Sequence, residues 1–176
     1  MSNDPEPSAG RRGSYRCGEV ADLPAIQQVD EAVFGEGLAY PYFVLRQLFD
    51  LFKEYSVVVT DNDKIVGYAL IGIEPGKDAS PDVAWLLGLG VVPAARGNGY
   101  GKELLARALD LCEKTDVGTV KITVRPTNAT ARGIYEEAGF KPMHTEDAYF
   151  GPDQPRDVLR LELGRDRDRQ LADVRR

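Results

Sequence analysis

A buried strand that runs directly into a glycine-rich turn constrains the fold of this chain more than any other feature. The segment 83–92, VAWLLGLGVV, is apolar at nearly every position, which is typical of a strand covered on both faces. The next motif, RGNGYG at 96–101, has glycine at alternate positions, and a helical pattern then continues to about residue 114. A strand, a tight turn and a helix in this order indicate an α/β protein.

Strand and helix patterns alternate over the rest of the chain. Apolar or alternating runs predict strands at 15–20, 55–60, 64–73, 83–92, 118–124, 140–144 and 157–163. Helical spacing predicts a helix capped by Asp22, a second at 42–52, a third after the glycines and a fourth at 128–139. The fourth helix is expected to turn these residues inward: Ala131, Ile134, Tyr135 and Ala138. The sequence therefore predicts a mixed α/β (α+β) fold, one domain with a central, mostly antiparallel sheet of about seven strands and about four helices.

The length and composition fit one folded domain with a tail at each end. The chain has 176 residues, 43% of them apolar, which is enough for one substantial core. The polar residues 1–13 and the basic residues 165–176 are expected to be flexible tails that flank a domain at 14–164. No segment approaches the run of about 20 apolar residues that spans a bilayer, and the N-terminus lacks an apolar signal segment. We therefore expect a cytoplasmic protein with no membrane contact.

Charge and cysteine usage argue against two further classes of site. The formal net charge is −6, and both tails are rich in arginine, so the body is more acidic than the whole chain. Nucleic-acid binding needs a basic surface that neutralises phosphates, so no nucleic-acid partner is expected. Cys17 and Cys112 lie far apart with no histidine near either one, so neither a metal site nor a disulfide is predicted.

The glycine turn has the properties of an anion-binding site. It precedes the first turn of a helix, where unpaired N–H groups and the positive end of the helix dipole converge. Gly97, Gly99 and Gly101 allow anion oxygens to approach the backbone, and Arg96 can add a charge-assisted contact. The spacing of the glycines fits neither a P-loop nor a Rossmann fingerprint.

Two motifs resemble those of the GNAT superfamily of N-acetyltransferases. The run V-x-P-x-x-R-G-x-G-x-G, from Val91 to Gly101, resembles its acyl-CoA pyrophosphate loop, and N-x-x-A-x-x-x-Y-x-x-x-G-F, from Asn128 to Phe140, resembles its second cofactor-side motif. The resemblance extends over 15–163 and implies a sheet whose fourth and fifth strands splay apart to admit acetyl-CoA. It implies the following cofactor-binding residues: Leu89, Val91, Arg96, Gly97, Asn98, Gly99, Tyr100, Gly101, Lys102, Asn128 and Tyr135.

For catalysis, the resemblance implies direct attack of an amine on the thioester of acetyl-CoA. Backbone N–H groups near Val91 and Leu89 would hold the carbonyl and the pantetheine arm, and Tyr135 would protonate the leaving thiolate as general acid. The general base is not carried over, because Trp85 and Thr123 stand about where many family members place a glutamate.

Three residues and a water-mediated path remain open as the base. Asp82 begins the apolar strand, and His144 is the only histidine. Glu36 lies between the first two helices, where some protein N-terminal acetyltransferases use a glutamate near the substrate. A weak or indirect base favours an amine of low pKa, because freeing an α-amine at pH 7 costs about 1.4 kcal/mol, against about 4.6 kcal/mol for a lysine.

The acceptor is therefore expected to be the α-amine of a peptide or protein N-terminus. The loop around Tyr149 resembles the acceptor loop of ribosomal-protein N-terminal acetyltransferases, and Tyr40, Pro41 and Tyr42 would form the opposite lip. Glu36 is a further substrate-binding candidate. Acidic side chains within 146–153 would suit a cationic acceptor. A small-molecule amine, such as an antibiotic or a metabolite, and a non-catalytic acyl-CoA-binding module remain alternatives. The oligomeric state, including a homodimer, also stays open.

Overall fold

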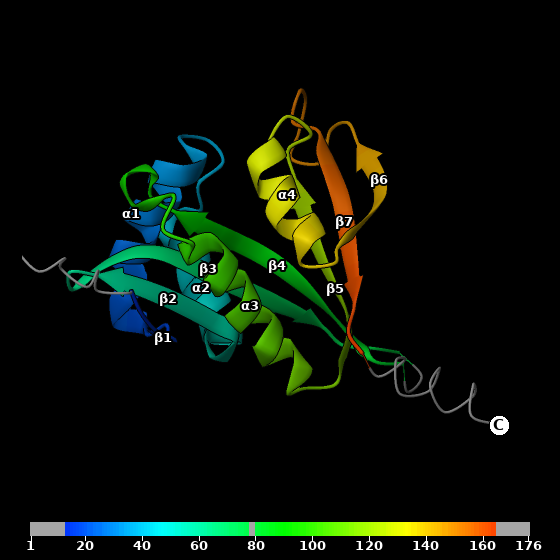
Figure 1. Cartoon of the computed structure of the whole chain (residues 1–176), viewed down its shortest axis with the longest axis horizontal. Helices are drawn as coiled ribbons and strands as arrows, with labels where there is room; N and C mark the ends of the chain where they lie inside the picture. Colours follow the sequence, from blue (N-terminus) through cyan, green and yellow to red (C-terminus); the bar gives the residue numbers. More distant parts are fainter. Residues whose placement is uncertain (1–12, 78–79, 165–176) are drawn as a thin grey trace, which may run out of the picture.

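The computed structural model describes residues 13–77 and 80–164, which form a seven-stranded sheet with helices on both faces (Figure 1). The strands are β1 (Ser14–Cys17), β2 (Ser56–Asp61), β3 (Lys64–Glu74), β4 (Asp82–Val91), β5 (Val117–Val124), β6 (Lys141–Glu146) and β7 (Arg156–Glu162). The helices are α1 (Leu23–Phe34), α2 (Tyr42–Phe52), α3 (Tyr100–Glu113) and α4 (Ala129–Glu137). The strand order is β1-β2-β3-β4-β5-β7-β6, and all neighbours are antiparallel except β4 and β5. This architecture confirms the predicted fold class.

β4 and β5 pair over only part of their length. Their pairing begins at Asp82 opposite Val117 and ends at Leu86 opposite Ile122. Beyond that point β4 stays with β3 and β5 stays with β7, so the two halves of the sheet diverge as a V, which Figure 1 shows opening upward. The predicted splay between the fourth and fifth strands is confirmed, and we call the opening between them the gap.

A β-bulge interrupts β4 where it leaves β5. In the pairing with β3, Leu70 lies opposite Gly88 and Ile71 lies opposite Leu86, so Leu87 is the extra residue. A bulge bends its strand and changes the direction of nearby groups. Glycine follows the bulge because a Cβ at Gly88 would lie 2.5 Å from the hydroxyl oxygen of a tyrosine on β3. The bulge therefore places an irregular stretch of backbone at the start of the gap.

Two helices cover each face of the sheet. α3 and α4 pack over one face, where Leu104 and Tyr135 join a cluster with residues of β4 and β5. α1 and α2 pack on β3 and β4 at the other face, where Ile26, Phe49 and Tyr68 form a second cluster. The gap thus opens toward an α3/α4 side and an α1/α2 side.

Two local predictions are wrong. The Asp22 side chain does not cap α1; it accepts a hydrogen bond from the N–H of Glu19 at 2.8 Å and pairs with Arg16 at 2.5 Å. The reason is that a 3-10 turn, Val20–Asp22, precedes the helix and uses this carboxylate. Ala138 is exposed instead of facing the core, because α4 has already ended.

The predicted tails, 1–13 and 165–176, lie outside the described residues apart from Gly13. Within the part of the chain that is described, no helix combines the length and the apolar character needed to cross a bilayer.

Candidate active site

The turn between β4 and α3 is held in shape by its own side chains. Gly97 and Gly99 have φ of 83° and 80°, a left-handed conformation that glycine adopts without strain. The Nε of Arg96 donates to the carbonyl of Val91 at 3.1 Å, and Asn98 Nδ2 donates to a carbonyl of the preceding 3-10 turn, Pro93–Ala95, at 3.1 Å. A Cβ at either glycine would meet no described atom within 4 Å. The turn is therefore braced by two side-chain hydrogen bonds and has open space in front of it.

The N-terminus of α3 presents backbone donors to this space. The first N–H bonded within the helix is that of Glu103, which donates to Gly99 at 3.1 Å. The N–H groups of residues 100–102 thus have no partner within the helix. Such donors, together with the helix dipole, favour binding of an anion such as a pyrophosphate.

The side chains of Tyr100 and Lys102 are occupied elsewhere. Tyr100 is 7% exposed, and its hydroxyl donates to Asp61 at 3.0 Å, so only its backbone reaches the turn. Lys102 Nζ pairs with Glu137 of α4 at 2.6 Å, and both side chains are exposed. Lys102 is thus tied to α4 yet remains at the surface beside the turn.

β4 presents unpaired backbone donors to the gap. The N–H of Val92 donates to Val66 of β3 at 2.9 Å. Because N–H groups alternate in direction along a strand, those of Val91 and Leu89 point away from β3 and toward the gap. Among residues 13–77 and 80–164, no strand pairs with this edge of β4 beyond Leu86. These two N–H groups are therefore available to a ligand.

Tyr135 of α4 lies on the α3/α4 side of the gap. It is 6% exposed, packs edge-to-face on Phe140 and belongs to the cluster that Leu89 and Val91 join. Burial raises the pKa of its hydroxyl above the ordinary value of 10, so the group is protonated at neutral pH. No described residue forms a hydrogen bond with this hydroxyl. Asn128 caps the helix that carries Tyr135 through its side-chain oxygen.

A buried carboxylate organises the α1/α2 side of β4. Asp30 of α1 is fully buried, and it accepts hydrogen bonds from the Tyr68 hydroxyl and, at 2.6 Å, from the Tyr40 N–H. Burial raises the pKa of Asp30, and the two hydrogen bonds oppose that shift. The Tyr40 hydroxyl in turn donates to the bulge carbonyl of Leu87 at 3.1 Å. We call these four residues the Asp30 network; it ties the α1–α2 loop to the start of the gap.

Tyr40 and Tyr149 are the two tyrosines expected to contact an acceptor. Burial raises the pKa of Tyr40, and the charges of Asp30 and Tyr149 contribute to the same shift. Tyr149 packs edge-to-face on Phe150, with ring centroids 4.8 Å apart. Glu36 is exposed on the α1–α2 loop and lines, with Tyr40, a hollow of about 390 Å³. The structure thus brings Glu36 and Tyr40 to one hollow, and the contact of Tyr149 with an acceptor stays a prediction.

The other candidate bases lie away from the gap. Asp82 begins β4 and accepts a hydrogen bond from the N–H of Gly76 at 2.8 Å. It is five residues from Leu87, a separation of about 17 Å along a strand. His144 is exposed on β6, which β7 separates from β5. Of the two carboxylates considered as the base, Asp82 and Glu36, Glu36 is the one on the α1–α2 loop beside the gap.

Asp30 and Tyr68 were not predicted as functional residues, although Asp30 leaves a signal in the sequence. Asp30 occupies the apolar face of its helix, beside Val29 and four residues after Ile26. A carboxylate in such a pattern is rarely buried unless it has partners. The pattern does not reveal which donors bind this carboxylate, since Tyr68 lies on a distant strand, β3.

Comparison with known proteins identifies the family. Residues 23–140 match the model of the acetyltransferase (GNAT) family, a span that runs from the start of α1 past the end of α4. The chain belongs to this family. The predicted class, a GNAT N-acetyltransferase with acetyl-CoA as co-substrate, is confirmed at the level of the family.

Relatives of this GNAT chain carry different acceptors in their names. This chain is 27% identical over 133 residues to ribosomal protein bS18-alanine N-acetyltransferase of Escherichia coli. The alignment covers 75% of this chain and 83% of the relative. The chain is 43% identical over 64 residues to mycothiol acetyltransferase of Beutenbergia cavernae, which covers 36% of this chain and 22% of that protein. The matched segments span only 22% to 38% of three mycothiol acetyltransferases, less than two thirds of their length.

A solved structure supports the same fold. A chain of the NatC complex bound to Gag peptide and CoA superposes with a TM-score of 0.79, over 86% of this chain and 99% of that chain. Their sequences are 20% identical. The likeness is therefore one of fold, and the acceptor has to be argued from this chain's own residues.

Proposed function

We propose that this GNAT protein transfers the acetyl group of acetyl-CoA to the α-amine at the N-terminus of a peptide or protein. The observation that carries the proposal is the two-sided gap between β4 and β5. Backbone donors of β4 and the Tyr135 hydroxyl lie toward the α3/α4 side, while Tyr40 and Tyr149 narrow the α1/α2 side. A thioester held from the first side can be approached by an amine from the second.

The cofactor side fits an acyl-CoA. The pyrophosphate binds the open turn 96–101 and the unpaired N–H groups at the start of α3, while Arg96 and Lys102 supply positive charge. The pantetheine arm extends along the free edge of β4, where Leu89 offers a backbone donor. Asn128 and Tyr135 of α4 border the same space.

Acetyl transfer needs a donor at the carbonyl and a proton for the leaving group. The amine nitrogen attacks the thioester carbon, and the Val91 N–H stabilises the negative charge that develops on the oxygen. The carbon–sulfur bond then breaks, and the thiolate takes the proton of Tyr135. The nitrogen gives up its remaining extra proton as the amide forms, and water returns this proton to the Tyr135 oxygen. Because burial keeps that hydroxyl protonated, it is ready to act as general acid.

The acceptor ammonium must first lose a proton. We propose that water carries this proton to Glu36 at the mouth of the gap, since Asp82 lies too far along β4 to take part. The cost of deprotonation supports an α-amine, at about 1.4 kcal/mol, over a lysine, at about 4.6 kcal/mol. Tyr40 and Tyr149 are the residues that hold the first residues of the peptide.

The test is CoA release from acetyl-CoA with N-terminal peptides, internal-lysine peptides and small amines, with product masses locating the acetyl group. We expect acetylation of peptide α-amines. In Tyr135→Phe, kcat should fall by about 100-fold while the dissociation constant for acetyl-CoA stays within twofold. If acetyl-CoA binds and no amine is acetylated, the chain is an acyl-CoA-binding module instead.

A small-molecule amine is the second candidate acceptor. It is favoured by the 43% identity to a mycothiol acetyltransferase over 64 residues. Turnover confined to small amines in the same panel would establish this candidate and overturn the peptide assignment.

A further inference from the structure

Two arginines at the mouth of the gap lack a carboxylate partner. Of the eight arginines that the structure describes, five form ion pairs: Arg16, Arg46, Arg107, Arg132 and Arg160. The three others are Arg96, Arg125 and Arg156. Arg96 lies at the proposed pyrophosphate site, Arg125 directly follows β5, and Arg156 begins β7. In a chain with a net charge of −6, arginines left without a counter-ion call for a physical reason.

Arg156 is a buried charge. The residue is 7% exposed, its guanidinium lies 4.8 Å over the Phe150 ring, and Nη1 donates to the backbone carbonyl of Pro155 at 2.7 Å. Burial and the nearby Arg125 both lower its pKa. Arg125 is exposed and has one weak contact, with Gln154 at 3.5 Å. A buried cation beside a second cation is unfavourable unless an anion joins them.

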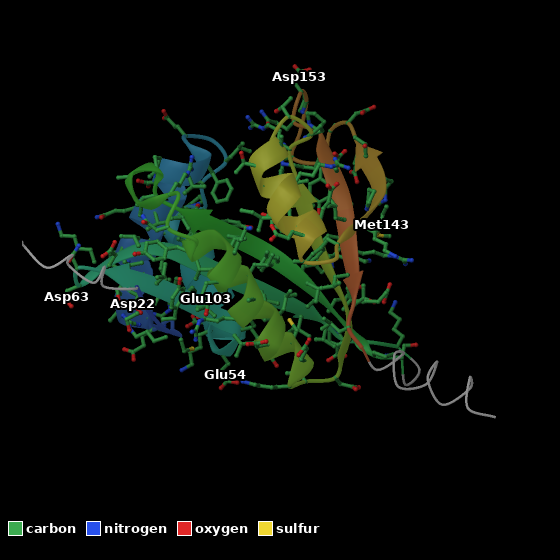
Figure 2. The ribbon with its side chains drawn as sticks, in the orientation of Figure 1. Asp22, Glu54, Asp63, Glu103, Met143 and Asp153 are labelled. Atoms are coloured by element: carbon green, nitrogen blue, oxygen red, sulfur yellow. The ribbon has the colours of Figure 1, made fainter. Side chains whose placement is uncertain are left out.

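The acidic residues of the neighbouring loop do not supply that anion. Glu146 lies opposite Arg156 in the β6–β7 ladder, but no carboxylate of the described residues comes within 4.0 Å of either Arg125 or Arg156. Asp153 lies at the outer tip of the loop between β6 and β7, as Figure 2 shows. The acidic residues of 146–153 still leave a cationic acceptor as an alternative prediction, which a peptide with Lys at its second position tests.

Arg156 faces the acceptor side of the sheet. Val124 of β5 lies opposite Asp157 of β7; Val124 joins the cluster under α3 and α4, and Asp157 pairs with Arg132 of α4. Successive side chains of a strand point to opposite faces, so Arg156 points to the α1/α2 face.

The arginines are also within reach of the acceptor lip. Phe150, beneath the Arg156 guanidinium, packs on Tyr149, which interacts electrostatically with Tyr40. Arg125 is three residues beyond Ile122, the last residue of β5 that pairs with β4, or about 10 Å along the chain. A group bound by the two arginines would therefore lie one or two residues along a peptide from an amine in the gap.

We propose that Arg125 and Arg156 bind a carboxylate of the acceptor, so that the preferred substrate is an amine with an acidic group close to it. This inference rests on the proposed acetyl transfer and adds a substrate class to it. The carboxylate comes either from an acidic side chain in the first residues of a peptide or from a free amino acid. Guanidinium groups suit this role because they bind carboxylates in a bidentate manner.

The test compares acceptors that differ only in charge. Kinetics are measured with peptides that carry Glu, Gln or Lys at the second position, and with free glutamate and glutamine. The variants are Arg125→Gln and Arg156→Gln, with Arg160→Gln as the matched control. Arg160 lies on the same strand and face as Arg156 but pairs with Glu162, so it reports the effect of lost charge alone.

We expect kcat/KM for the Glu peptide to exceed that for the Gln peptide by about tenfold or more. Arg125→Gln should bring this ratio close to one without changing the KM for acetyl-CoA, whereas Arg160→Gln should keep it. Arg125 is exposed, so this variant should fold even if Arg156→Gln does not. Preference for free glutamate over all peptides would assign the carboxylate to an amino acid.

Two different failures are distinguishable. Equal rates with the Glu and Gln peptides, a preference for the Lys peptide, or an unchanged ratio in Arg125→Gln would overturn the carboxylate site and leave acetyl transfer standing. Failure to acetylate any amine while acetyl-CoA still binds would overturn the proposed function and this inference together.

Discussion

Replacing Tyr68 with phenylalanine tests whether the Asp30 network stabilises the acceptor side of the site. The substitution removes one hydroxyl from a side chain that is 1% exposed and leaves the ring in place. That hydroxyl donates to Asp30, which is fully buried and has one other described donor, the Tyr40 N–H. The variant thus leaves a buried carboxylate with half of its hydrogen bonds.

The expected cost follows from the charge of the acceptor group. A hydrogen bond to a buried charged group contributes about 2 kcal/mol, roughly twice the contribution of a neutral one. For a domain of this length, 2 kcal/mol corresponds to a decrease of about 4–8 °C in Tm. Tyr100→Phe is the matched control, since its hydroxyl donates to Asp61, which is only half-buried. Water can replace that bond, so the decrease in Tm should be clearly smaller.

The effect should also depend on pH. Burial raises the pKa of Asp30 above its unfolded value, so the folded protein binds this proton more tightly than the unfolded chain. The contribution of Asp30 to stability is therefore least favourable at neutral pH and improves as the pH falls through the folded pKa. Losing the Tyr68 donor raises that pKa further, so the difference between the variant and the parent should shrink from pH 7 to pH 5.

Thermal unfolding followed by circular dichroism at pH 7 and pH 5 measures both effects. In an Asp30→Asn background, Tyr68→Phe should cost about 1 kcal/mol or less, because no carboxylate remains. The reasoning is refuted if Tyr68→Phe and Tyr100→Phe lower Tm equally at pH 7, or if the cost of Tyr68→Phe grows at pH 5.

Four further substitutions test the turn and the assignment of the base. Gly99→Ala should lower the free energy of unfolding by about 1 kcal/mol, because φ is +80° there. Gly133→Ala, in α4 and equally open, should raise it by about 0.5–1 kcal/mol; denaturant titration of both variants checks the opposite signs. Asp82→Asn should leave kcat within twofold, whereas Glu36→Gln should lower kcat/KM for peptides below pH 7. Steady-state kinetics of both variants as a function of pH check this. If Asp82→Asn is the more defective variant, the proposed base is wrong.

Much of the fold could be predicted because it rests on local rules. The period of apolar residues indicated every strand and helix, and φ above zero at Gly97 and Gly99 is a backbone requirement that glycine meets. The cap of α4 at Asn128 is local in the same way. Where a competing local element intervened, as with the 3-10 turn at Asp22, the prediction was wrong.

The residues of the acceptor side depend instead on contacts between distant segments. Asp30, Tyr40 and Tyr68 come from a helix, a loop and a strand, and only the register of β3 with β4 places them beneath the bulge. Arg125 and Arg156 become neighbours because β5 pairs with β7. The sequence by itself determined the glycine turn, the order of elements and the tyrosine of α4, since each follows from spacing along the chain. Only the tertiary structure decided which charges remain unpaired at the gap, because ion pairing depends on distances of a few ångströms between strands far apart in sequence.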